Sequence, residues 1–511
     1  MTNLLAIDLG TGNMKLAVPD DQGNSRLLTN SSGAPSTPTA VFLDGDRILL
    51  GREADNARFQ DPDRGIREWK RHMGSDAVLA VSAAGKEYRA RDCAEVFIAD
   101  AKTTYENKTG EVLTHVVMGI PANYEQRQRQ ETKAAAEALG LEVVQLVHEP
   151  TAAALGNGVH HRGDGLYLIA DLGQGTFDVN LVRVHGEKVT VAGTAGVPKL
   201  GGLDFSARLQ EHALGQFEAE HGFRPTQEQH PLALLDLYHR VEQAKCTLSS
   251  RDSATIVVSC EGQMALVAVT QALFRDLCAD LVERAMDCVS KCLDECGVQS
   301  DGLEEALAVG GASRMRMFRE AIEGRLGVQP SAQCEADYAV ALGCVIAGRM
   351  ELERQGRPLV INGRRLPPIR LFAEEVTSHD IGVTALTEER DRQVNATILK
   401  KNTPIPCEHT ESFQLAEPGQ TDARIELLEG QADAGRDHCR VLGHCDLSGL
   451  PSVQSDPHQI DVTMRLDRSG MLQLCAQDTA SGREAELSIE YLHQSQPDAE
   501  GSGTGGVQAS A

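Results

Sequence analysis

Two stretches of the chain, one beginning at Leu5 and the other at Leu168, share one pattern. Each is an apolar strand that ends in an aspartate, Asp8 or Asp171, before a glycine-rich turn and a second apolar run. Glycine lets the backbone approach an anion closely and turn its N–H groups toward it. The aspartate beside each turn can hold a hydrated metal ion. Two matched copies therefore predict a duplicated fold whose turns face each other across a cleft, as a nucleotide phosphate site with Mg²⁺.

Neither turn fits the two commoner phosphate motifs. No Gly-Lys-Ser/Thr follows, which excludes a P-loop, and strand-like residues stand where a dinucleotide fingerprint needs a helix. Ordinary hairpin turns, whose glycines only supply positive φ, remain an alternative for either copy taken alone. They explain a matched pair poorly.

Composition narrows the class of protein. A chain of 511 residues is long enough for two or three domains. The net charge of −25 argues against a general binder of nucleic acid or anionic membranes. No apolar run is long enough to span a bilayer, and the N-terminus does not resemble a signal peptide. The 13 cysteines lack paired small-domain spacing, which indicates free thiols in a reducing cytoplasm and disfavours zinc sites.

The pattern of the chain changes twice. Residues 1–350 alternate strand-like and helix-like segments, which is typical of an α/β domain. Residues 351–375 contain Gly356, Gly363 and Pro367-Pro368, which indicates a linker. Residues 376–492 show strand alternation broken by turns and predict an antiparallel β-sandwich. Residues 493–511 are rich in Gly, Ser, Gln and Ala and are expected to be disordered.

Further motifs follow in a fixed order. They are Trp69-Lys70-Arg71, the run from Val147 to Ala154, Gly201-Gly202-Leu203-Asp204, and Val309-Gly310-Gly311-Ala312-Ser313-Arg314. With the two turns and the β domain, they resemble the seventy-kilodalton heat-shock chaperones of the DnaK type over residues 1–492. The resemblance implies a two-lobed, actin-like (RNase H-like) α/β ATPase domain, followed by an all-β sandwich that binds extended peptides.

The resemblance also implies roles for single residues. Asp8 and Asp171 would position hydrated Mg²⁺, Lys70 would stabilise charge on the γ-phosphate, and Glu149, Thr176 and Asp178 would position the attacking water. The remaining nucleotide contacts would come from Gly10, Thr11, Gly12, Asn13, Gly173, Gln174, Gly175, Thr176, Gly201, Gly202, Glu242, Lys245, Ser249, Gly310, Gly311, Arg314 and Asp337.

Three positions depart from the family pattern around the nucleotide. Gly12 stands where family members commonly have a threonine, and Gln174 stands within a turn that is usually three glycines. Cys246 takes the place of an arginine that usually stacks on the adenine. Losing that guanidinium should weaken ATP binding, because cation–π stacking contributes on the order of 1 kcal/mol.

In the β domain, the resemblance implies a peptide groove formed by six residues. They are Ile381, Val383, Leu386, Phe413, Ala416 and Ala423. Ala423 replaces a larger apolar residue, so the central pocket is expected to be wider. The stretch from Leu371 to Glu375 is only half apolar where the family has an apolar linker, and nothing after Leu492 resembles the family's helical lid.

The sequence thus favours a lidless, slowly hydrolysing ATPase that binds ATP and Mg²⁺ and alters an open peptide groove. Its partners would be extended or unfolded polypeptides and, by family resemblance, a J-domain cochaperone and a nucleotide exchange factor. One alternative is a binding module in which ATP acts as a ligand switch without being hydrolysed. A weaker alternative is an actin-like filament protein.

Overall fold

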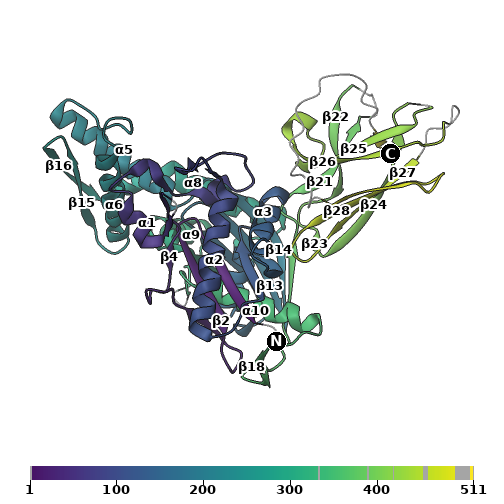
Figure 1. Cartoon of the computed structure of the whole chain (residues 1–511), viewed down its shortest axis with the longest axis horizontal. Helices are drawn as coiled ribbons and strands as arrows, with labels where there is room; N and C mark the ends of the chain where they lie inside the picture. Colours follow the sequence, from purple (N-terminus) through teal and green to yellow (C-terminus); the bar gives the residue numbers. More distant parts are fainter. Residues whose placement is uncertain are drawn as a thin grey trace. The chain divides into compact units, whose positions relative to one another are not determined.

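The computed structural model describes residues 3–45, 47–331, 334–387, 391–417, 419–452, 459–488 and 507–509. The chain divides into two compact units. The first consists of Met1–Asn123 and Ala134–Ala373, and the second of Tyr124–Lys133 and Glu374–Ala511. Figure 1 shows mixed helices and strands in the purple-to-teal part of the chain, and mainly strands in the yellow-green part.

The first lobe of the first unit is built on a mixed sheet in the order β11-β10-β1-β2-β3. Strand β1 pairs in parallel with β10 and antiparallel with β2. Both β1 and β10 are buried along their whole length, as expected for central strands with covered faces. The strands span Leu4–Leu9 (β1), Asn13–Pro19 (β2), Ser25–Leu28 (β3), His115–Ile120 (β10) and Glu142–His148 (β11).

The second lobe repeats this arrangement. Its strands lie in the order β17-β12-β13-β14, with β12 parallel to β17 and antiparallel to β13. The strands span Gly165–Leu172 (β12), Phe177–His185 (β13), Lys188–Val197 (β14) and Glu305–Val309 (β17). In both lobes, a parallel neighbour flanks the first strand of an antiparallel meander. The duplication predicted from the two glycine-rich turns is therefore present in the fold.

Two helices, α4 (Glu149–Gly156) and α10 (Ala339–Arg354), pack closely against each other. Glycine makes the approach possible, since a Cβ on Gly343 would lie 1.7 Å from the carbonyl oxygen of Ala152. The other helices of at least seven residues are α1 (Gly51–Ala57), α2 (Ala90–Thr109), α3 (Gln126–Glu137), α5 (Gly202–His221), α6 (Pro231–Leu248), α7 (Gln271–Leu277), α8 (Ala279–Glu295) and α9 (Arg316–Leu326). Among the helices that the structure describes, none has the length and apolar character needed to cross a membrane.

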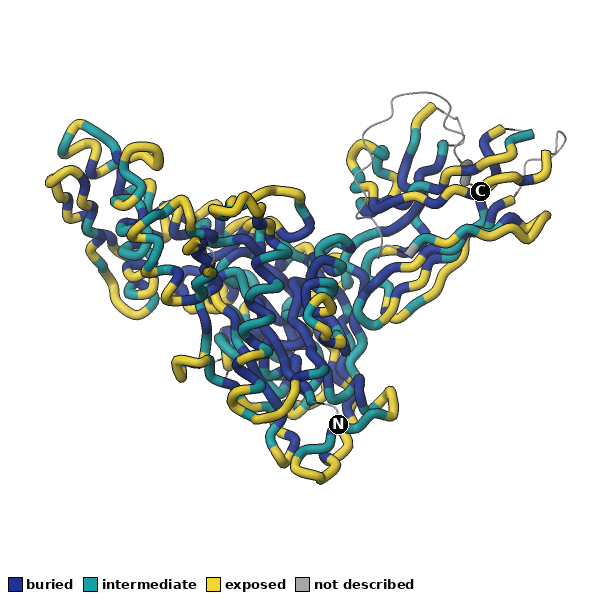
Figure 2. The backbone as a smooth tube through the Cα atoms, viewed as in Figure 1, coloured by how far each residue is buried: buried dark blue, intermediate teal, exposed yellow. Residues whose placement is uncertain are grey.

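Smaller sheets complete the first unit. One joins β5 (Val41–Asp44) to β6 (Arg47–Leu50) and β7 (Gly65–Ile66), and a hairpin joins β15 (Ser253–Cys260) to β16 (Gln263–Thr270). The backbone coloured by burial in Figure 2 shows the central strands of this unit as continuous dark blue. Two large apolar cores account for this burial, one centred on β13 and helices α5 to α9, the other on α4 and α10.

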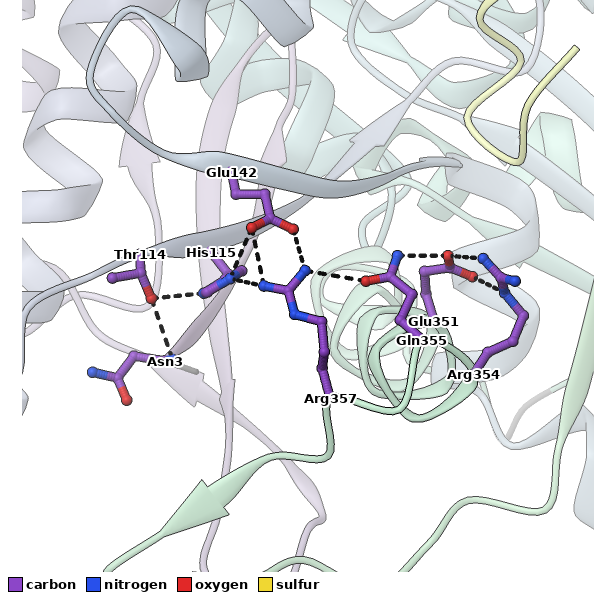
Figure 3. Close-up of polar contacts among 8 residues, drawn as sticks. All are labelled: Asn3, Thr114, His115, Glu142, Glu351, Arg354, Gln355 and Arg357. Carbon is purple, nitrogen blue, oxygen red and sulfur yellow. Dashed lines mark hydrogen bonds and ion pairs between the residues drawn. The ribbon is translucent and has the colours of Figure 1, made fainter. Parts of the chain in front are cut away.

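Residues 351–373, expected to belong to a linker, instead pack as part of the first unit. Helix α10 continues to Arg354, and a short hairpin joins β18 (Val360–Ile361) to β19 (Arg364–Arg365). Beside it, Arg357 donates from Nη1 to Glu142 Oε1 at 2.5 Å and contacts His115, as Figure 3 shows. The glycines and prolines of this segment therefore mark turns on the surface of the first unit and not a free linker.

The second unit contains the expected β-sandwich sheet, in the order β26-β25-β21-β30-β24-β27-β28-β29, with β22 also paired to β21. Its strands span Asp380–Leu386 (β21), Gln393–Leu399 (β22), Cys407–Leu415 (β24), Asp422–Gly430 (β25), Arg440–Ser448 (β26), Gln459–Leu466 (β27), Leu472–Asp478 (β28), Glu484–Ser488 (β29) and Val507–Ala509 (β30).

Strand β30 is a difference from the sequence expectation, because residues 493–511 carry no apolar periodicity and were expected to be disordered throughout. A single added strand needs no such periodicity, since the edges of its neighbours supply the hydrogen-bonding partners. The other residues of this tail lie outside the described ranges, as do residues 388–390 between β21 and β22.

Candidate nucleotide site

The two glycine-rich turns have the same backbone geometry. In the first, the Gly10 N–H donates to the carbonyl of Asn13 at 3.1 Å, and in the second, the Gly173 N–H donates to the carbonyl of Thr176 at 3.1 Å. The strand register places Asp8 opposite Lys15, and Asp171 opposite Asp178. Each turn therefore leaves its aspartate at the end of a buried strand.

The turns also touch each other. A Cβ on Gly175 would lie 2.5 Å from Thr11 Oγ1, and a Cβ on Gly12 would lie 1.4 Å from Gln174 Oε1. Gln174 Nε2 in addition lies 3.4 Å from the hydroxyl of Tyr238. The absent side chain at Gly12 thus makes room for the side chain at Gln174.

A cavity of about 430 Å³ opens beside the turns, within the first unit. It brings together most of the residues predicted from the sequence: Asp8, Gly10, Thr11, Gly12, Asn13, Lys70, Glu149, Asp171, Gly173, Gln174, Thr176, Gly202, Glu242, Lys245, Ser249, Gly310, Gly311, Arg314 and Asp337. Cys246 lines it as well. A cavity of this size is within the range of small-molecule sites.

Three predicted residues, Gly175, Gly201 and Asp178, do not line the cavity. Gly175 packs against Thr11, and a Cβ on Gly201 would lie 2.5 Å from the carbonyl oxygen of Gln174, so both glycines allow close backbone contacts behind the wall. Asp178 is buried, and its Oδ1 has no hydrogen-bond partner among the described residues.

Charged groups alternate around the end of the cavity beside the two turns, where the sequence predicts the phosphates and which we call the phosphate end. Lys15 Nζ donates to Asp8 Oδ2 at 2.8 Å, and Lys70 Nζ donates to Glu149 Oε1 at 2.7 Å. Burial raises the pKa of Asp171 to about 7, and repulsion by Glu149 and Asp8 acts in the same direction. Burial also raises the pKa of Asp178 well above its ordinary value, with Glu149 and Asp171 adding to the effect. This end of the cavity therefore holds buried negative charge that only partly has a cation beside it.

A buried aromatic residue holds Lys70 in position. Trp69 has no exposed surface, stacks on Phe97, and donates from Nε1 to the carbonyl of Thr39 at 3.1 Å. Thr39 in turn donates to the carbonyl of Thr11 at 2.6 Å. The segment that carries Lys70 is thus fastened directly to the first turn.

Helix α6 supplies part of the opposite end of the cavity. Lys245 Nζ donates to Glu242 Oε1 at 2.8 Å, Ser206 Oγ at 2.7 Å and the carbonyl of Gly202 at 2.9 Å. Cys246 follows it on the helix, exposed and without the guanidinium that the family pattern has there. The lysine thus fixes α6 against the start of α5 and leaves a small side chain at the edge of the cavity.

The facing wall comes from the segment after β17. Gly310 has φ of +80°, and a Cβ there would lie 2.5 Å from Asp171 Oδ1, so only glycine fits. Arg314 donates from Nη2 to Asp337 Oδ2 at 2.5 Å, although its side chain is 57% exposed. The pair keeps a planar guanidinium beside the cavity, where the sequence predicts the nucleoside.

Some lining residues were not predicted from the sequence, namely Lys15, Ala312, Met315, Ala336 and Val340. Lys15 had a detectable signal, because a hairpin closed by Gly10 and Asn13 places it directly across from Asp8. The others are apolar and cannot be told from core residues in the sequence alone.

The predicted peptide-binding residues lie in the second unit, on β21, β24 and β25 or directly beside them. Ile381, Val383, Phe413 and Ala423 belong to one apolar core, and Leu386 is half-buried. Ala416 follows the end of β24 and is buried. Strands β21 and β24 are the two neighbours of β30.

Comparison with known proteins agrees with this geometry. The profile of the Hsp70 protein family matches residues 4–502. The chain belongs to the Hsp70 family. The chaperone protein DnaK of Halobacterium salinarum, in each of two strains, is 30% identical to it over 493 residues. That match covers 95% of this chain and 75% of the relative. The resemblance read from the sequence motifs is therefore confirmed at the level of the family, and Hsp70 membership supports the actin-like ATPase and β-sandwich architecture.

Proposed function

We propose that this protein is an ATP-dependent chaperone, which hydrolyses ATP slowly with Mg²⁺ and couples its nucleotide state to the binding of extended hydrophobic peptides. The observation that carries this proposal is the end of the cavity beside the two glycine-rich turns, where Lys15, Lys70, Asp8, Glu149 and Asp171 line the wall and Asp178 lies directly behind it. Family membership supports both the ATPase activity and the chaperone function. The free thiols at all 13 cysteines suit a reducing compartment such as the cytoplasm.

The phosphate end suits an anion together with a divalent cation. The backbone N–H groups of the turns would face the phosphates, and Lys15 and Lys70 would add positive charge. The raised pKa values of Asp171 and Asp178 reflect buried carboxyl groups that lack a full complement of cations. Among the described residues, no three acidic, histidine or cysteine side chains lie close enough to hold a metal alone. This donor set fits Mg²⁺, which keeps several waters and takes phosphate oxygens beside one or two carboxylates.

In this proposal each side chain has a defined task. Bound Mg²⁺ would neutralise charge on the β- and γ-phosphates. Asp8 and Asp171 would orient it through its waters, and Lys70 would stabilise charge developing on the γ-phosphate. Glu149 accepts a hydrogen bond from Lys70 at 2.7 Å and would turn toward the attacking water once Lys70 contacts the phosphate. Thr176 would hold the water, with Asp178 orienting the Thr176 hydroxyl from behind.

One observation favours the alternative of a non-hydrolysing, ATP-switched binding module. The side chain of Gln174 lies where the two turns meet and lines the cavity. It could keep the phosphates from settling between the turns as closely as a third glycine would allow. ATP would then bind and shift the conformation without being turned over.

A single-turnover ATPase assay separates the two functions. Wild-type protein should hydrolyse ATP, and Lys70→Ala should lower the rate by about 10²–10³, the usual cost of removing one preorganised charge. Lys291→Ala, at a side chain that is 67% exposed, is the matched control and should turn over at the wild-type rate.

Nucleotide binding, followed by calorimetry, should persist in Lys70→Ala. Binding without turnover in the wild type would favour the ligand switch. Equal turnover in Lys70→Ala and wild type would remove the lysine from the mechanism, and the same assay with an added leucine-rich peptide would reveal any coupling to the β domain.

A further inference from the structure

Strand β30 lies in the sheet of the second unit between β21 and β24, which do not pair with each other within the described ranges. On β21, the edge opposite β22 is shared by two strands. Strand β25 pairs with it from Asp380 to Val383, and β30 takes over at Ala385 and Leu386. The tail strand thus begins where β25 leaves the edge.

The other edge of β30 is paired as well. It runs antiparallel to β24, with Val507 opposite Leu415, Gln508 opposite Gln414 and Ala509 opposite Phe413. Two residues of the tail, Val507 and Gln508, are therefore paired on both sides, and Ala509 is paired with β24. A strand added between existing edges in this way is the standard mode by which a sheet captures an extended peptide through its backbone.

The neighbours of β30 are residues of the expected peptide groove. Leu386 and Phe413 are both register partners of the tail. Ala385 and Leu415, the partners of Val507 on the two sides, are each 1% exposed. Val507 is the only large aliphatic residue in the sequence from 493 to 511. The backbone register of the tail thus sets this one residue opposite Ala385 and Leu415.

We propose that Val507–Ala509 occupies the peptide groove as an intramolecular ligand and competes there with external peptides. This inference rests on the proposed peptide-binding function and adds a regulatory partner, the chain's own tail, to the same site. Peptides that displace the tail must supply more backbone pairing or more apolar contact than its three residues provide.

The tether is short enough for the competition to matter. Residues 489–506, 18 in all, separate β29 from β30. A tether of that length holds a segment at an effective concentration in the millimolar range. A three-residue strand binds weakly on its own, so the tethered tail should occupy the groove only part of the time. It should lower the affinity for external peptides by roughly 3- to 10-fold.

The test uses the full chain with one change in the tail. Gln508→Pro removes the N–H at the centre of β30 and cannot continue the ladder, whereas Gln508→Ala removes only the side chain and is the matched control. Binding of a fluorescein-labelled Ser-Ala-Leu-Leu-Leu-Ala-Ser peptide is measured by anisotropy. Gln508→Pro should tighten binding by about 3- to 10-fold, and Gln508→Ala should stay within twofold of the wild type.

Hydrogen exchange provides a readout that needs no external peptide. The amides of Phe413 to Leu415 and of Ala385 and Leu386 should exchange faster in Gln508→Pro than in the wild type or Gln508→Ala. Unchanged exchange in Gln508→Pro would overturn the inference whether or not the labelled peptide binds. Equal peptide affinity in all three proteins would overturn the competition. Faster exchange in Gln508→Pro with no peptide binding in any protein would support tail pairing and contradict the proposed peptide-binding function instead.

Discussion

At the scale of single residues, Gln174 and Gly12 depart together from the Hsp70 pattern. Taken separately, each is a loss: a missing threonine in one turn and a missing glycine in the other. In the folded protein they are complementary, because a Cβ on Gly12 would overlap Gln174 Oε1 at 1.4 Å. The space that the usual threonine would fill at position 12 is thus taken by the side chain of Gln174 from the other turn.

This complementarity predicts non-additive effects. Gly12→Thr alone should lower the ATPase rate and the ATP affinity, because the new side chain must displace Gln174. Gln174→Gly alone should loosen the contact between the turns and lose the approach to Tyr238. The double variant Gly12→Thr/Gln174→Gly should recover most of the loss caused by Gly12→Thr. Interaction energies of about 0.5–3 kcal/mol are usual for residues in contact.

A double-mutant cycle on single-turnover rates and on calorimetric ATP affinity measures the interaction. Far-UV circular dichroism of each variant checks that the fold is kept. Losses that simply add in the double variant would contradict direct packing of Gln174 against Gly12.

Asp171 illustrates a conflict between stability and function. Its pKa in the folded protein is about 7, raised first by burial, whereas in the unfolded chain it is about 3.9. Ionised Asp171 therefore destabilises the nucleotide-free protein, most strongly above pH 7 and progressively less as the pH falls toward 4. Asp171→Asn should raise the free energy of unfolding at pH 8 by about 1–3 kcal/mol.

Thermal unfolding at pH 8 and pH 5, without nucleotide or Mg²⁺, tests this prediction. Asp171→Asn should raise the unfolding temperature more at pH 8 than at pH 5. In this variant, added ATP and Mg²⁺ should no longer raise the unfolding temperature. The control is Asp301→Asn, at an exposed side chain. It should change neither the unfolding temperature at the two pH values nor its response to ATP and Mg²⁺. Destabilisation by Asp171→Asn at pH 8 would mean that Lys15 and Lys70 outweigh burial at this position.

At the scale of secondary-structure elements, the crossing of α4 and α10 depends on small residues. A Cβ on Gly343 would lie 1.7 Å from the carbonyl oxygen of Ala152, which is backbone and cannot move aside easily. Gly343→Ala should therefore destabilise the first unit by about 1–3 kcal/mol or more, the usual range for overpacking.

The matched control is Gly324→Ala in α9, where no atom lies within 4 Å of the added Cβ. That change should be neutral or stabilising by about 0.5–1 kcal/mol, because alanine favours helix more than glycine does. Urea unfolding of the wild type and both variants measures these changes in the free energy of unfolding. Equal stability of Gly343→Ala and wild type would show that the two helices can separate without cost.

The elements that the sequence predicted best were those with a local signal. The two hairpins could be recognised because strand, aspartate and glycine-rich turn are consecutive in the chain. The segment from 351 to 373 misled because glycine and proline mark turns whether or not the turns pack on a domain. Its attachment depends on distant partners, such as Arg357 with Glu142, and on the burial of Leu366 and Leu371.

In the candidate site too, contacts between residues distant in sequence could not be predicted. Motif residues such as Lys70 and Gly310 could be placed from the sequence, and both line the cavity. Lys15 was missed because its partner Asp8 becomes visible only through the hairpin register. Asp178 was assigned to the catalytic groups, but whether a side chain reaches the cavity or stops behind its wall depends on packing that a motif does not encode.

At the scale of the whole molecule, the chain makes its last passage from the first unit to the second in a short stretch whose ends differ in environment. Leu371 is buried against the core of the first unit, whereas the Phe372 side chain is exposed. The Phe372 N–H nonetheless donates to the carbonyl of Glu187 at 2.9 Å, so the backbone here is fastened to the first unit. This is one of three places where the chain passes between the two units, the others lying between Asn123 and Tyr124 and between Lys133 and Ala134.

The last prediction concerns that influence. Because Leu371 is the one fully buried apolar side chain between residues 371 and 375, and two glutamates, Glu374 and Glu375, follow it, we expect ATP to change the dissociation rate of a bound peptide by less than about tenfold relative to ADP. Leu371→Asp should abolish the change, since a charge would not stay in the apolar core. Phe372→Asp, at an exposed side chain, should preserve it. Stopped-flow dissociation of a labelled leucine-rich peptide measures both variants, with basal ATP turnover showing that the first unit remains folded. A hundredfold acceleration by ATP in the wild type, or a wild-type response in Leu371→Asp, would show that nucleotide state reaches the β domain by a route other than this stretch of chain.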